Sequence, residues 1–197
     1  MKKWIIIGIV LIVLFVLYRM FAGTYNSMVQ KNELVEKQWA QVENVYQRRL
    51  DLIPNLVKTV KGYAEYEKSV LTEVIQARAN ATQVKIDPKN LSAEEIKKFQ
   101  DAQSSLSSSL SRLLLVVERY PDLKANQNFM DLQKQLEGTE NRIATERNSF
   151  NERVNEYNAY IKRFPQNLMA GMFGFMPKAY FESDKEAKKA PDVNEYL

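Results

Sequence analysis

Cysteine and histidine are both missing from this chain of 197 residues. Their absence excludes catalysis by a thiolate or an imidazole base, and it excludes the zinc, iron–sulfur and haem sites that depend on those ligands. Only six glycines are present, and none lies in a G-x-x-x-x-G-K, G-x-G-x-x-G or G-x-S-x-G pattern. The sequence therefore predicts a protein that is not an enzyme and binds no cofactor.

The excess of basic residues is confined to one end of the chain. There are 28 Lys and Arg against 24 Asp and Glu overall, but three of the basic residues, Lys2, Lys3 and Arg19, lie in residues 1–23, which contain no acid. The remainder has 25 basic and 24 acidic residues and is close to neutral. A nucleic-acid partner is not expected, because such proteins present a strongly basic surface.

One long apolar run occupies the N-terminus. It extends uncharged from Trp4 to Tyr18, and Met20 to Gly23 continue it past Arg19. A membrane-spanning helix needs about 20 such residues, and this run reaches that length if its flanking basic side chains extend to the interfaces. We predict a membrane anchor at residues 1–23, with the lipid bilayer as its partner. Its defining positions are Trp4, Leu11, Leu17, Tyr18 and Arg19.

Two other interpretations of the apolar run are a cleaved secretory signal and a buried core helix. A signal also begins with basic residues, but no A-x-A-like pair of small residues follows this run. The basic residues nearest to it, Lys2 and Lys3 on one side and Arg19 on the other, favour an N-terminus inside and an exported domain by a small margin.

From residue 24 onward, apolar residues recur at alternating steps of three and four, which is the pattern of packed helices. No comparable stretch alternates in the manner of a strand. We predict an all-α fold, in which the N-terminal transmembrane helix is followed by an antiparallel four-helix bundle over residues 24–165. Representative positions of the apolar stripe are Trp39, Val42, Tyr46, Ile53, Leu106, Leu110, Leu113, Phe150, Val154 and Tyr157.

Helix ends are predicted from proline and capping residues. Ser92 and Glu95 form an S-x-x-E capping box that opens a helix, and Pro121 and Pro165 each end one. Pro54 is compatible with a kink in one long helix or with a corner between two helices. A single helix across Pro54 exceeds the length of any partner that could cover it, so burial favours the corner at Asp51–Pro54.

A group of polar residues lies on or beside the apolar stripe. Arg49 and Arg147 fall on stripe positions, where a charge needs a partner. We predict that the group fixes the register of the helices, with Arg147 paired to a carboxylate across the bundle; contact with a partner and a ligand site are the alternatives. The candidate network is Asn44, Arg48, Asp51, Asn55, Glu140, Asn141, Arg147 and Asn158.

A carboxylate site for Ca²⁺ or Mg²⁺ at Glu65, Glu67 and Glu140 is formally possible. Acidic residues on helix faces are usually solvated or ion-paired, so no metal site is predicted.

Residues 166–182 form an apolar segment that contains glycine. It fits either a short helix docked on the bundle or a hydrophobic patch for self-association or membrane contact. The polar residues 183–197 are predicted to be disordered. The candidate interface residues are Met169, Met172, Phe173, Phe175, Tyr180 and Phe181.

Several motifs suggest a family: WAQVENVYQRRLDLIPNLV at residues 39–57, TENRIA at residues 139–144, Phe164-Pro165 and Tyr180-Phe181. Together they closely resemble the LemA family. The resemblance implies a bacterial single-pass membrane protein with a four-helix-bundle domain, no established activity and no catalytic residues. The expected location is the bacterial cytoplasmic (inner) membrane.

Two functions are compatible with these features. The first is a scaffold or adaptor that forms homo-oligomers or binds another membrane protein near the bilayer. The second is a sensor that holds a small ligand or a cation in the polar network between the helices.

Overall fold

The computed structural model describes residues 2–63 and 67–182. Helices account for most of these residues, and no strand occurs among them. The elements are α1 (Lys2–Lys61), α2 (Lys68–Gln83), α3 (Ala93–Val117), α4 (Pro121–Lys124), α5 (Gln127–Lys162) and α6 (Gln166–Phe173).

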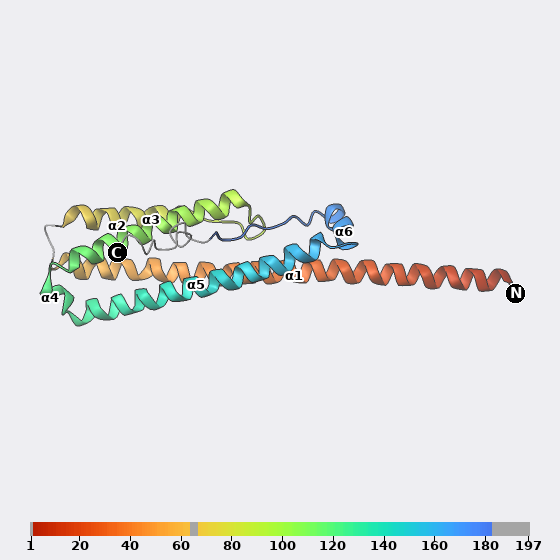
Figure 1. Ribbon diagram of the computed structural model, residues 1–197, viewed down its shortest axis with the longest axis horizontal. Helices are drawn as coiled ribbons and strands as arrows, with labels where there is room; N and C mark the ends of the chain where they lie inside the picture. Colours follow the sequence, from red (N-terminus) through yellow and green to blue (C-terminus); the bar gives the residue numbers. More distant parts are fainter. Residues whose placement is uncertain (1, 64–66, 183–197) are drawn as a thin grey trace, which may run out of the picture.

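Figure 1 shows an elongated molecule in which α1 runs along the whole length. Helix α5 lies antiparallel to the inner part of α1, and α2 and α3 form a second antiparallel pair beside them. The all-α prediction, with an antiparallel four-helix bundle after an apolar N-terminal helix, is confirmed.

The N-terminal third of α1 projects beyond the bundle (Figure 1). Its apolar side chains are exposed, among them Trp4 at 78%, Leu11 at 61% and Tyr18 at 68%. This helix is long and apolar enough to cross a membrane, and none of its most apolar window is buried within the protein. A large apolar surface of this kind has to be covered by something other than water.

The buried residues of the bundle form two clusters. The cluster nearer the exposed apolar stretch, here called the proximal core, contains most of the buried aromatic residues. The other, the distal core, is mainly aliphatic, and Phe129 is its one fully buried aromatic residue among those described. The buried aromatic residues of the proximal core are Trp39, Tyr46, Phe99, Phe150, Tyr157 and Phe181.

Helix α1 continues through Pro54, so the predicted corner at Asp51–Pro54 is wrong. A proline inside a helix cannot donate a hydrogen bond to the carbonyl four residues earlier, which is that of Leu50. Arg78 of α2 supplies the missing donor, because its Nε donates to Leu50 O at 2.8 Å. The helix ends instead at Lys61, just before Gly62.

The uninterrupted helix α1 is covered because one of its partners is nearly as long as its part in the bundle. Helix α5 has 36 residues, nearly enough to cover all of α1 outside the exposed apolar stretch. Helix α2 has only 16, and its buried side chains all belong to the distal core. In the proximal core, the connection between α2 and α3 and the segment after α6 supply the remaining cover, through Ile86, Leu91 and Phe181.

The predicted helix boundaries in the second half of the chain are close to those observed. Ser92 caps α3, where Glu95 N donates to Ser92 Oγ at 3.3 Å. Helix α3 ends at Val117, a short turn follows, and Pro121 begins α4. Helix α5 ends at Lys162, shortly before Pro165. The predicted disorder of residues 183–197 concerns a segment outside the described residues.

Candidate functional site

A polar layer separates the two cores at the middle of the bundle. Its centre is Arg49 of α1, which is 1% exposed and lies between Tyr46 of the proximal core and Leu50 of the distal core. Gln103 of α3 and Thr139 of α5 are also buried at this level. Buried charges are costly unless they are paired and hydrogen-bonded, so the partners of Arg49 decide what the layer can do.

Arg49 is held by groups from two other helices. Its Nη1 donates to Glu140 Oε1 of α5 at 2.7 Å and to Ser107 Oγ of α3 at 2.9 Å. Its Nη2 donates to the side-chain oxygen of Gln103, and its guanidinium lies 5.1 Å from the ring centre of Tyr46. Three helices are thus joined at one residue, which fits a role in setting their register.

A hollow of about 520 Å³ opens beside Arg49 between α3 and α5. Helix α3 lines it with four serines at helical spacing, and the charged residues around it are three basic and three acidic. Because these charges balance, the hollow has no strong preference for an anion or a cation. The serines are Ser104, Ser107, Ser108 and Ser111, and the charged residues are Arg49, Lys97, Arg147, Asp101, Glu140 and Glu182.

The structure brings only part of the predicted polar network together. Glu140 pairs with Arg49 in the polar layer, and Arg147 borders the same hollow. Asn158 lies elsewhere, buried in the proximal core. The other members are exposed on helix surfaces, and of these Asp51 accepts a hydrogen bond from Gln47 within α1. The exposed members are Asn44, Arg48, Asp51, Asn55 and Asn141.

Arg147 contacts the segment that follows α6. Its Nη2 donates to the backbone carbonyl of Glu182 at 2.7 Å, and its guanidinium lies 5.2 Å from the ring centre of Phe181. A buried arginine paired with a carboxylate occurs at Arg49, the other arginine on the apolar stripe.

Residues 174–182 pass along the proximal core in extended form (Figure 1), and we call them the docked tail. Side-chain amides bind its backbone at three residues, each through both N–H and C=O. Asn158 binds Lys178 at 2.8 and 2.9 Å, and Asn151 binds Phe181 at 3.0 and 2.9 Å. Gln100 binds Glu182 in the same way, at 3.0 and 3.2 Å.

Phe181 anchors the docked tail in the aromatic cluster. It is 4% exposed, stacks on Trp39 with ring centres 5.8 Å apart, and meets Phe150 edge-on at 5.3 Å. Aromatic pairs in such geometries add stability beyond the area that they bury.

Two titratable groups are buried where the docked tail meets the bundle, Lys178 of the tail and Tyr157 of α5. Burial lowers the pKa of Lys178, although the nearby Glu36 and Asp87 carboxylates act in the opposite direction. Lys178 Nζ donates to the carbonyl of Pro88 at 3.2 Å and lies 3.8 Å from Glu36 Oε1. Burial, with a further contribution from Glu36, raises the pKa of Tyr157 to about 12. Its hydroxyl donates to Met176 O at 3.0 Å.

The candidate interface residues divide into two sets. Met169 and Phe181 are buried, and Phe175 is partly buried against the proximal core. Met172, Phe173 and Tyr180 are exposed at 73%, 52% and 42%. The apolar segment therefore both docks on the bundle and presents an apolar surface outward.

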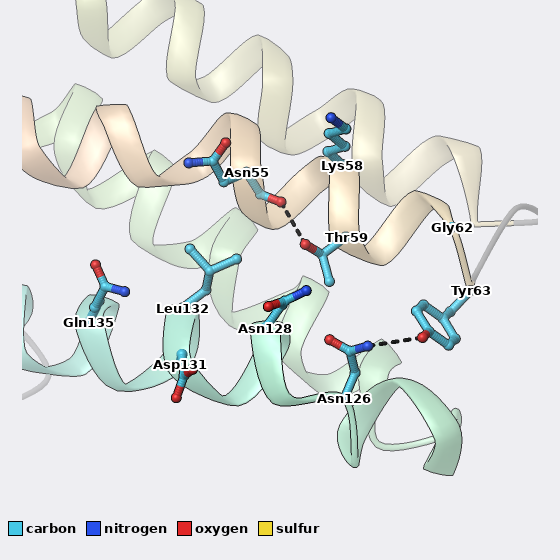
Figure 2. A pocket seen from close by; sticks show the side chains of 10 residues that line it. All are labelled: Asn55, Lys58, Thr59, Gly62, Tyr63, Asn126, Asn128, Asp131, Leu132 and Gln135. Atoms are coloured by element: carbon cyan, nitrogen blue, oxygen red, sulfur yellow. Dashed lines mark hydrogen bonds between the residues drawn. The ribbon is translucent and has the colours of Figure 1, made fainter.

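A second hollow, of about 700 Å³, lies at the far end of the bundle. Figure 2 shows its side chains coming from the last turns of α1 and the first turns of α5, with Asn126 Nδ2 donating to Tyr63 Oη. The distance of that hydrogen bond is 2.9 Å. Its lining is polar, with Lys58 and Asp131 of opposite charge, and it presents no nucleophile beside a base.

No cluster of three potential metal ligands occurs within residues 2–63 and 67–182. Of the carboxylates considered from the sequence, Glu67 binds Arg119 and Tyr120, whereas Glu140 binds Arg49. Glu65 lies outside the described residues. The two described carboxylates thus have separate partners in different parts of the bundle.

The sequence did not lead us to predict most of the side-chain amides that bind the docked tail. Asn151 and Asn158 are seven residues apart and so lie on one face of α5, directly beside the core residues Phe150 and Tyr157. Two asparagines repeated along a core face are a detectable signal of a shared backbone partner. Gln100 and Lys178 carried no comparable signal.

The sequence profile of the LemA family matches residues 38–194. The chain is 27% identical over 190 residues to magnetosome protein MamQ 2 of Paramagnetospirillum magneticum, covering 88% of this chain and 70% of that protein. It is 26% identical to magnetosome protein MamQ of Magnetospirillum gryphiswaldense, over 86% of this chain and 68% of the relative. Protein LemA of Metamycoplasma hominis is 20% identical, over 98% and 85%.

The matched region contains most of the bundle, with the polar layer and the docked tail. It begins beyond the exposed apolar stretch of α1, whereas the alignment with protein LemA of Metamycoplasma hominis covers 98% of this chain and so includes most of that stretch. Together with that stretch, these relatives indicate a membrane-associated helical protein. The chain belongs to the LemA family.

Proposed function

We propose that this protein is a non-enzymatic, membrane-anchored scaffold or adaptor of the bacterial inner membrane. It acts by self-association or by binding a membrane protein partner, with the bundle on the exported side. The observation that carries this proposal is the continuity of α1, which passes from the exposed apolar stretch into the bundle without a linker. A continuous helix fixes the height of the bundle above the bilayer and its direction relative to the spanning segment.

The hydrogen-bond partners of the buried polar groups support a structural role. Arg49 is bound by Glu140, Ser107 and Gln103, and Asn158 is bound to the backbone of the docked tail. These groups join parts of the protein to each other. The names of the relatives, magnetosome protein and LemA, do not refer to a catalysed reaction.

The second candidate is a sensor that binds a small polar molecule in the hollow beside Arg49. One observation favours it: Arg49 Nε is buried and has no hydrogen-bond partner among the described residues. The balanced charges of the hollow limit this candidate to neutral or zwitterionic ligands, because a net charge would not be selected.

Native mass spectrometry of the full chain, released from detergent or from nanodiscs, separates the two candidates. The scaffold predicts discrete multiples of the 22.9 kDa chain or a defined complex after crosslinking in intact cells. A photo-crosslinking residue at Leu115 suits the second measurement, because this side chain is 70% exposed on α3. The sensor predicts a monomer whose thermal stability rises with a polar metabolite.

Ser104→Trp is the matched variant, because it fills the hollow without removing a partner of Arg49. The scaffold predicts unchanged assembly and unchanged crosslinks in this variant. A monomeric chain that gains stability from a metabolite, and loses that gain in Ser104→Trp, would contradict the scaffold and establish the sensor.

A further inference from the structure

An apolar face with no protein cover lies on α6 and the residues beside it. Leu168 and Met172, four residues apart, are 60% and 73% exposed. Phe164 before the helix is 79% exposed, and Met176 after it is 73% exposed. Four large apolar side chains so exposed at one place form a surface that suits an apolar partner.

The opposite face of α6 is fixed to the bundle. Met169 and Ala170 are each 5% exposed and belong to the proximal core. Phe175 N donates to Ala170 O at 2.9 Å just beyond the end of the helix. The outward face is therefore held in a defined direction and cannot turn inward to bury itself.

The position of α6 indicates what covers this face. Phe173 packs against Tyr25 of α1 with ring centres 5.0 Å apart, and Phe175 packs against the same ring at 5.8 Å. Tyr25 lies only four residues beyond Phe21, near the end of the exposed apolar stretch. At 1.5 Å per residue, that separation is about 6 Å along the helix axis. Figure 1 accordingly shows α6 beside α1 where the bundle gives way to the projecting helix.

We propose that α6 and its flanking residues dock on the lipid bilayer, with Phe164, Leu168, Met172 and Met176 inserted at the level of the headgroups. The face lies beside the end of the apolar stretch of α1 (Figure 1), so a bilayer crossed by that stretch is close to it. The exposed residues Lys162 and Arg163 immediately precede the face and suit anionic headgroups. The inference rests on the membrane anchor of the proposed function.

Docking of α6 adds a second attachment to the one that α1 provides. A single spanning helix leaves the bundle free to rotate about the helix axis. A second contact beside that axis fixes the rotation, so the same side of the bundle always faces the membrane.

Site-directed labelling of the full chain in vesicles tests this inference, and the absence of cysteine makes each introduced cysteine unique. Nitroxide labels are placed at Met172→Cys and Phe164→Cys, in vesicles that contain anionic lipid. Asn167→Cys is the matched control, since Asn167 is exposed on the same helix about 100° round from Leu168. Leu115→Cys is an exposed apolar position on α3, remote from α6.

Flotation of the vesicles first shows whether the chain is anchored, and collision with oxygen and with a water-soluble nickel complex then gives the depth of each label. Labels at positions 172 and 164 are expected about 5–10 Å below the headgroup boundary, with the label at 167 shallower and the label at 115 in water. Spin–spin broadening between copies identifies a protein contact.

A chain that floats while its labels at 172 and 164 are as open to nickel as the label at 115 would overturn the docking of α6 and leave the anchor intact. Labels at 172 and 164 that are protected from nickel and also show spin–spin broadening between copies would overturn the docking on lipid in favour of self-association. A chain that fails to float would contradict the anchor and the docked face together.

Discussion

The proximal and distal cores of this bundle are closed in different ways. The distal core is mainly aliphatic, and all of its buried residues lie in helices. The proximal core is aromatic, and an extended segment, the docked tail, completes it. The difference follows from the length of α2, whose 16 residues end before they reach the proximal half.

This contrast explains why side-chain amides bind the backbone of a buried extended segment in the proximal half of the bundle. A helix satisfies its own backbone groups, whereas an extended segment must find partners for its N–H and C=O groups when it is buried. Asn151, Asn158 and Gln100 supply those partners for the docked tail. The buried residues of the distal core all lie in helices, whose backbone groups are satisfied within the helix.

The largest effect is expected from Phe181→Ala, which removes the aromatic anchor of the docked tail. Truncating a buried Phe costs about 3–5 kcal/mol. The loss cannot exceed the free energy that docking of the tail contributes, because the tail is then released from the bundle. Denaturant unfolding of the full chain in detergent measures it. Tyr180→Ala, at the 42% exposed neighbour, is expected to lose less than about 1 kcal/mol. Equal losses in the two variants would mean that the tail does not complete the core.

The polar layer between the two cores should respond unequally to loss of its two charges. Glu140→Ala leaves the buried Arg49 without its counter-charge, and a loss of about 2–3 kcal/mol is expected. This is less than for a fully buried pair, because the Glu140 side chain is 45% exposed. Arg49→Met is expected to lose less, since it fills the space and leaves a carboxylate that water can reach. Thermal melts compare the two variants, and a greater loss in Arg49→Met would contradict this order.

In the distal half, the bond from Arg78 to the Leu50 carbonyl should matter only because of Pro54. Arg78→Leu is expected to cost about 1–2 kcal/mol, since it leaves that carbonyl without a donor. Pro54→Ala restores a backbone donor, so Arg78→Leu should cost clearly less in the Pro54→Ala background. A double-mutant cycle measures the coupling, and strictly additive losses would refute the assignment.

The smallest effect concerns Tyr157 in the proximal core. Its pKa is raised to about 12 in the folded chain, whereas an unfolded tyrosine loses its proton near pH 10. The stabilising contribution is complete below pH 10 and is lost as the pH rises to 12. Tyr157→Phe should therefore lose stability less steeply than the wild type between pH 10 and 12. Parallel curves from chemical unfolding at several pH values would contradict the buried hydroxyl.

Apolar spacing was sufficient to predict the helices and most of the core, since Trp39, Tyr46, Ile53 and Val60 keep one register and are all buried. It could not predict the path of α1 at Pro54, because the donor that rescues Leu50 O comes from Arg78, 28 residues away. The docked tail could not be predicted either, because an extended segment has no helical period. Its existence depends on the space left by the short helix α2.

Positions on the apolar stripe predict a polar site inside the bundle, but they do not identify all of its residues. Stripe positions identified Arg49 and Arg147 as charges that need partners, and both are held by other segments of the chain. Asn44 and Arg48 belong to the predicted network, but both are exposed to solvent. Proximity along a helix does not distinguish its faces, whereas the apolar period does.

The continuity of α1 between the apolar stretch and the bundle is tested most directly by a distance between two spin labels. Met20→Cys lies near the end of the apolar stretch, and Lys58→Cys lies in the last turn of the helix. An unbroken helix of 1.5 Å per residue places them about 57 Å apart. Double electron–electron resonance on the full chain in nanodiscs should give one narrow distribution at that distance. A broad or clearly shorter distribution would show that the bundle is hinged on its anchor, and would contradict a rigidly held scaffold.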